Sequence, residues 1–128
     1  MLTPMIKFIA LLLIAIAPSL SQADGNKLLE YCIEAEKHLE KKEVNNPFSI
    51  GFCLGMIQGV RNTLIIINEI QPKNLQLCWP DGGINNSQAV RILLNYLRSN
   101  PENLHKDEVL LTMLSFQKAY KCSSESIR

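Results

Sequence analysis

The sequence predicts an all-α fold, a small bundle of four to five helices stabilised by two disulfides. Apolar residues recur at steps of three and four in four separate segments, which is typical of helices with one buried face. Proline, asparagine and glycine separate these segments, and none of them alternates as a strand would. Four cysteines follow a segment typical of exported proteins. With 128 residues, the chain has room for one domain.

The N-terminal residues 1–23 have the three parts of a secretory signal peptide. Lys7 is the only charge before Asp24, and Phe8–Ala17 is an unbroken apolar run. Ser21 and Ala23 then place small residues at −3 and −1 of a cleavage site. The alternative is an uncleaved membrane anchor, but so short a run does not cross roughly 30 Å of hydrocarbon. We therefore expect a mature chain that begins at Asp24.

Composition and charge exclude several classes of protein. The chain is 47% hydrophobic and 20% charged, which argues against disorder. Its formal net charge is +1, and removal of Lys7 leaves 12 basic against 12 acidic residues. The chain therefore lacks the excess of basic residues that would predict binding to nucleic acid or, after signal cleavage, to a membrane.

All four cysteines lie in the expected mature chain, at Cys32, Cys53, Cys78 and Cys122. An even number of cysteines in an exported domain predicts disulfides. No two are close-spaced as in tetrathiolate zinc sites, so we expect no metal. Three pairings are open to four cysteines, and the spacing does not choose among them.

The first two helices are expected at Asn26–Lys42 and Phe48–Ile70. The first has a single apolar stripe, whereas the second is apolar on nearly all sides and is expected to be the central helix. The uncharged stretch before Arg61 spans thirteen residues, which falls short of a transmembrane span.

Three glycines recur at every fourth position of the second helix, at Gly51, Gly55 and Gly59. Each costs about 1 kcal/mol of helix propensity relative to alanine, so an offsetting gain is expected. We favour the close approach of a neighbouring backbone along this stripe; a ligand in the groove is the alternative.

A long connection, Gln71–Asn86, leads to the third helix, Asn86–Ser99. Connections of this length are often functional, and Cys78 is expected to tie this one down. Asn85 and Gln88 predict a capping box at the start of the third helix. A single turn and then a last helix, at 107–120, complete the predicted fold.

No catalytic chemistry is predicted, and no cofactor. His38 lies among charged residues and His105 at a helix boundary, and neither belongs to a metal-binding motif. The cysteines are expected to be oxidised, and no Gly-x-Ser-x-Gly or phosphate-binding loop is present.

A binding surface remains as the functional element. Trp79 and Asp81 lie in the long connection, and Arg91, Asn95 and Arg98 form a polar stripe on the third helix. Aromatic and arginine side chains dominate interface energetics, so these five are the candidate partner-binding residues. The alternatives are that Trp79 fills the core beside a disulfide and that the arginines lie on a solvated helix face.

Four segments together resemble the Rap/Tai immunity proteins. Cys53–Val60 resembles the family's Cys-x-Gly-aromatic-Ile-x-Gly-Val segment, and Cys78–Ile84 its Cys-x-Pro turn. Tyr96–His105 resembles its Tyr-Leu…His-Pro-Glu…Leu-His stretch, and Ala119–Cys122 its closing Ala-Phe-Pro-Cys. The sequence departs from that pattern at Met56, Asn85, Asn100 and Lys121.

The resemblance implies that residues 24–128 form a helical immunity domain in the bacterial periplasm. Characterised members bind and block peptidoglycan amidases delivered by type VI secretion, and some are homodimers. We therefore expect an inhibitor that covers an amidase active site by steric occlusion. The alternative is a periplasmic binding or scaffolding protein of the same fold with no toxin partner.

For the disulfides we favour Cys32–Cys53 and Cys78–Cys122. A short turn between the first two helices makes them antiparallel neighbours, which suits the first pair. The second pair then follows by elimination.

Overall fold

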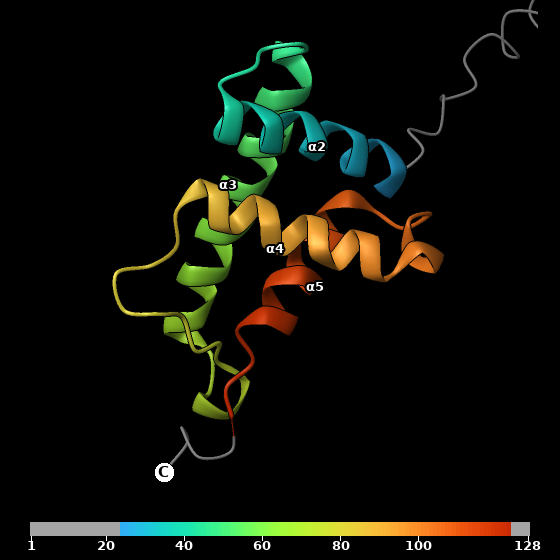
Figure 1. Ribbon diagram of the computed structural model, residues 1–128. Coiled ribbons are helices and arrows are strands. Elements are labelled where there is room, and N and C mark those ends of the chain that lie inside the picture. Colours follow the sequence, from blue (N-terminus) through green and yellow to red (C-terminus); the bar gives the residue numbers. More distant parts are fainter. Residues whose placement is uncertain (1–23, 124–128) are drawn as a thin grey trace, which may run out of the picture.

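The computed structural model describes residues 24–123, and within them the fold is all-α (Figure 1). The predicted signal peptide lies outside the described residues. The four α-helices are α2 (Gly25–Lys41), α3 (Pro47–Ile70), α4 (Asn86–Ser99) and α5 (Glu108–Ala119). Two short 3-10 helices, η1 (Lys73–Leu75) and η2 (Pro101–Asn103), lie in the connections. The predicted fold class is confirmed.

Each α-helix begins at a residue whose side chain accepts a backbone hydrogen bond. Asp24 caps α2, Asn46 caps α3 ahead of Pro47, and Asp107 caps α5. The predicted capping box of α4 is present, because Asn85 and Gln88 each accept from the other's backbone N–H. These caps satisfy N–H groups that have no partner inside a helix.

The core lies where the four helices meet, and each helix contacts the other three. The helices α2 and α4 lie side by side and both cross α3 (Figure 1). Fully buried side chains come from every helix. Those of greatest volume are Leu28, Ile57, Leu93, Leu94, Leu97, Leu111 and Phe116. The hydrophobic stripes predicted from the sequence therefore meet in a single core.

The sequence predicted α3 as the central helix, but in the structure every helix contacts the other three and only one side of α3 is buried, so that prediction was wrong. Phe48 and Ile66 are each 66% exposed and Ile70 is 80% exposed. Within the described residues, α3 is the one helix long and apolar enough to cross a membrane by length and composition. The sequence-based expectation that it falls short of that length was therefore wrong. A core helix of a water-soluble protein passes the same test, so this is weak support for a span.

The glycine stripe of α3 does not pack against a neighbour, so that prediction was wrong. A Cβ atom built at Gly51, Gly55 or Gly59 would meet nothing within 4 Å. The close approach occurs instead at Gly25, where a Cβ would clash with Leu111 and would lie 2.8 Å from the carbonyl oxygen of Leu104. Helical spacing predicted a common face for the three glycines, but not which side of α3 its neighbours cover.

Both favoured disulfides are present. Cys32–Cys53 joins α2 to α3 inside the core, and both of its cysteines are fully buried. Cys78–Cys122 joins the segment between α3 and α4 to the residues after α5. By loop-closure entropy, a bridge over 44 residues contributes about 4 kcal/mol to the free energy of unfolding.

Candidate functional site

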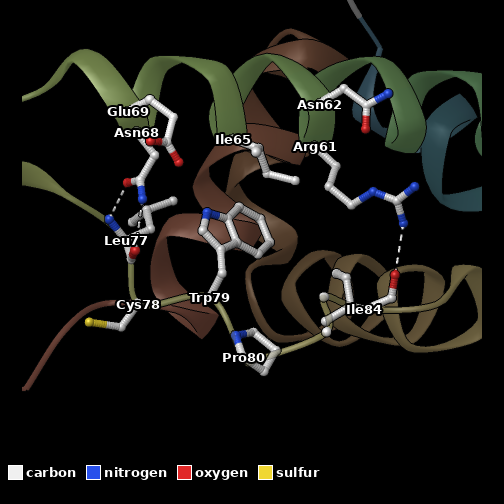
Figure 2. A pocket seen from close by; sticks show the side chains of 12 residues that line it. Arg61, Asn62, Ile65, Asn68, Glu69, Leu77, Cys78, Trp79, Pro80 and Ile84 are labelled. Atoms are coloured by element: carbon white, nitrogen blue, oxygen red, sulfur yellow. Dashed lines mark hydrogen bonds between the residues drawn. The ribbon is translucent and has the colours of Figure 1, made fainter.

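The segment between α3 and α4, residues 71–85, is fixed at two places against α3 and α5; we call it the connecting segment. At the first, Asn68 of α3 accepts from the backbone N–H of Leu77 at 2.6 Å and donates to its carbonyl oxygen at 3.1 Å. The backbone N–H of Cys78 donates to the carbonyl oxygen of Tyr120 at 2.8 Å, beside the disulfide. At the second, Arg61 Nη1 donates to the carbonyl oxygen of Ile84 at 3.1 Å (Figure 2).

An exposed turn lies between these two anchors. The backbone N–H of Gly83 donates to the carbonyl oxygen of Pro80 at 2.9 Å. Gly82 and Gly83 have φ values of 82° and 75°, which glycine adopts without the strain of a side chain. Asp81 is therefore presented to solvent on a turn whose flanks are held by the fold.

Trp79 is half-buried on the inner side of the connecting segment. Its ring lies 4.8 Å from that of Tyr120 and 5.8 Å from that of Phe116, centroid to centroid. Burial raises the pKa of the Tyr120 hydroxyl. The indole Nε1 of Trp79 is buried and donates to no atom of the described residues. An unsatisfied buried donor costs about 1–3 kcal/mol, so this N–H is a hydrogen-bond donor of the site that lacks an acceptor.

A cavity of about 580 Å³ separates the connecting segment from the C-terminal half of α3. In Figure 2, Arg61 and Glu69 lie toward opposite ends of it, and the Trp79 ring lies between them. Ile65 adds apolar lining from α3. The volume is within the range of small-molecule sites, about 300–1,000 Å³.

The two predicted arginines of α4 form ion pairs with α2. Arg91 Nε lies 3.5 Å from Glu40 Oε1, and Arg98 Nη2 lies 3.1 Å from Glu36 Oε2. Both arginine side chains are about half exposed, and exposed ion pairs contribute little to stability. Asn95 is also exposed and lines a smaller cavity between α4 and α5.

The structure places the five candidate contact residues in two groups. Trp79 and Asp81 belong to the connecting segment, whereas Arg91, Asn95 and Arg98 lie on α4. Within residues 24–123, no hydrogen bond or ion pair joins the two groups. Their role in binding a partner stays a prediction.

The polar residues with which α3 faces the connecting segment were not among the predicted site residues. Arg61 and Asn68 are seven positions apart, which places them on one face of the helix two turns apart. Both hold the connecting segment, and Glu69 follows directly. This spacing was a readable signal in an otherwise apolar helix.

Metal and thiol chemistry have no visible site in the described part of the chain. No group of three or more His, Cys, Asp or Glu side chains there is placed to hold a metal ion. All four cysteines are in disulfides, so none of them is a free nucleophile.

These features define a class: a small helical binding protein, cross-linked by disulfides, with a fixed and exposed connecting segment. The sequence model of the Rap1a immunity proteins matches residues 24–122. The chain therefore belongs to the Rap1a immunity protein family, as the four resembling segments predicted. No curated protein and no solved structure matches the chain. Family membership indicates an immunity function against a secreted effector, exerted by binding rather than catalysis.

Proposed function

We propose that this protein protects its producer in the periplasm by covering the active site of a peptidoglycan amidase delivered by type VI secretion. The observation that carries this proposal is the family match, which spans nearly the whole expected mature chain. The signal-peptide pattern at residues 1–23 supports export to the compartment in which the cell wall is cut. The inhibitor performs no chemistry, because occupation of the cleft is sufficient.

The connecting segment is the element best suited to enter or cover a cleft. It is tied to α3 at Leu77 and Ile84 and to the end of α5 through Cys78, so little conformational entropy is lost on binding. The turn between these anchors is exposed, and Asp81 forms no hydrogen bond or ion pair with the described chain. An interface of about 1,600 Å² in total is the usual scale for such a complex.

The exposed face of α4 supplies further contacts in this proposal. Arg91 and Arg98 pair with Glu40 and Glu36, and both guanidinium groups are accessible at the surface. A partner carboxylate can exchange with these acids at small cost, because exposed ion pairs are weak. Asn95 lies between the two arginines along the helix.

We also propose that the exposed side of α3 joins two copies of the chain in a homodimer. Phe48, Ile66 and Ile70 are largely exposed, and the glycine stripe beside them is open. The helix carries charges only at Arg61 and Glu69, so this apolar face meets a second copy without charge repulsion. A helix of 24 residues is about 36 Å long and provides an extended seam. Sedimentation of Ile66→Glu as a monomer and of the unaltered protein as a dimer is the expected result.

Capture of the partner tests the proposed function. The tagged protein, exported through its own signal peptide, is recovered from the periplasm of cells under attack by type VI-competent rivals. We expect a cell-wall amidase to co-purify. Two bait variants with the same change of charge are compared. Asp81→Lys is expected to retain less amidase. Glu30→Lys, at an exposed position of α2, is expected to retain as much as the unaltered bait. Recovery of no wall hydrolase would favour the scaffolding alternative.

A further inference from the structure

We propose that the cavity between α3 and the connecting segment is a binding site for a free peptide of three to four residues. This inference does not rest on the proposed effector, because it is argued from the residues that line the cavity, which include Pro80, Gly82 and Gly83 of the exposed turn. The charges that line the cavity, their spacing along α3 and the unpaired indole N–H of Trp79 support it.

The charges predict a ligand with one group of each sign. Among the residues that line the cavity, only Arg61 and Glu69 are charged. Arg61 donates to Ile84 through Nη1, and its other N–H groups have no acceptor among the described residues. Glu69 forms no hydrogen bond or ion pair with the described chain. Glu69 is exposed to solvent and Arg61 is half-buried, and a ligand carboxylate at Arg61 and an ammonium group at Glu69 would form an ion pair with each.

The separation of these two charges sets the length of the ligand. The backbone positions of Arg61 and Glu69 are eight residues apart, which corresponds to about 12 Å along the axis of α3. An extended peptide advances about 3.3 Å per residue, so three to four residues bring a free amine and a free carboxylate to the two ends. The apolar surface of Ile65 and Trp79 lies between and accommodates small apolar side chains.

Trp79 provides a third point of recognition. Its indole N–H has no acceptor among residues 24–123, and Figure 2 shows this nitrogen on the edge of the ring turned toward Asn68 and Glu69. A main-chain carbonyl of the peptide is an acceptor of the required kind. Because the nitrogen is covered in the unliganded protein, binding includes a small movement of the side chains around it.

The test uses tetra-alanine and the full mature protein. Trp79 is the only tryptophan in the sequence, so its emission reports directly on the cavity, and calorimetry gives an independent binding curve. We expect saturable binding with a change in emission, and affinity at least tenfold lower for the peptide acetylated at its N-terminus and amidated at its C-terminus. Dipeptides are expected to bind at least tenfold more weakly than tetra-alanine.

Glu69→Gln is the decisive variant, because Glu69 has no structural partner to lose. We expect it to weaken the binding of tetra-alanine at least tenfold and to leave the weak binding of the peptide capped at both ends unchanged. Glu30→Gln on α2 is the matched control and is expected to bind as the unaltered protein does. No heat or emission change with any peptide would overturn the proposal, and so would binding that ignores end-capping or Glu69→Gln. Either failure leaves the effector-capture experiment unaffected.

Discussion

The backbone N–H of Asp24 donates to Glu108 Oε2 at 3.3 Å, which joins the start of α2 to the start of α5. Asp24 also caps α2 through its side chain, which accepts from the backbone N–H of Asn26 at 2.9 Å. The predicted signal cleavage falls directly before Asp24, so in the mature protein this nitrogen is the terminal ammonium group. A cation at a helix N-terminus is unfavourable, and the Glu108 carboxylate offsets it.

This relationship predicts that Glu108 stabilises the cleaved chain more than an extended one. Glu108→Gln is expected to lower Tm by a few degrees in the chain that starts at Asp24. The decrease is expected to be smaller in a chain that retains Ala23, because an amide then replaces the ammonium group. Thermal unfolding of the four proteins measures the difference. Equal decreases in the two backgrounds would contradict the predicted pairing.

Acid is expected to destabilise the fold through two carboxyl groups. The hydrogen bond from the Asn26 side chain lowers the pKa of Asp24, and the hydrogen bond from Lys37 lowers the pKa of Glu34. A carboxyl whose pKa is lower in the folded state adds stability above its unfolded pKa, and this is lost as the pH falls through its folded pKa. Tm is therefore expected to decline below about pH 5. Asp24→Asn should flatten the decline, and an unchanged slope would contradict this assignment.

Glycine substitutions are expected to have opposite effects in α2 and α3. Gly25→Ala places a methyl group against Leu111 and the carbonyl oxygen of Leu104, which we expect to cost about 1–3 kcal/mol. Gly55→Ala adds a methyl group in open space within a helix and should stabilise the monomer by up to about 1 kcal/mol. Urea denaturation at low protein concentration measures both. Stabilisation by Gly25→Ala would contradict the observed close approach.

The fold was predictable because its determinants are local. Periodicity, with a capping residue such as Asn85, predicted the ends of the four helices to within one residue. The short turn between α2 and α3 also predicted Cys32–Cys53. The prediction for the glycine stripe was wrong because spacing shows which residues share a face, whereas the positions of α2, α4 and α5 decide which face is covered. Gly25 gave no signal, because its neighbours Leu104 and Leu111 are distant in sequence.

The candidate site was only partly predictable. Cys78 predicted that the connecting segment is tied to another part of the fold. Trp79 packs on Tyr120 and Phe116 with one side and lines a cavity with the other. The cavity was not predicted, because its charged lining residues Arg61 and Glu69 belong to a helix whose sequence is otherwise mostly apolar. The ion pairs of Arg91 and Arg98 join residues about fifty to sixty positions apart, and such pairings depend on tertiary structure.

Removal of the Cys78–Cys122 disulfide is expected to lower the stability of the protein and to loosen the connecting segment. Cys78→Ala with Cys122→Ala should lower the free energy of unfolding by about 4 kcal/mol and leave the core disulfide between α2 and α3 intact. Because Cys78 anchors the connecting segment, we expect amide exchange at Leu77–Ile84 to be faster in this variant than in the unaltered protein. Exchange that stays as slow as before would show that Asn68 and Arg61 fix the segment without the disulfide.

The central claim is that this protein stops a cell-wall amidase by occupying its active site. The most direct measurement is the rate at which the captured amidase cleaves purified peptidoglycan while the mature protein is titrated in. Amidase activity is expected to fall linearly as the protein is added and to reach the background rate when there is one inhibitor binding site for each amidase molecule. Full activity in the presence of saturating, bound protein would contradict it.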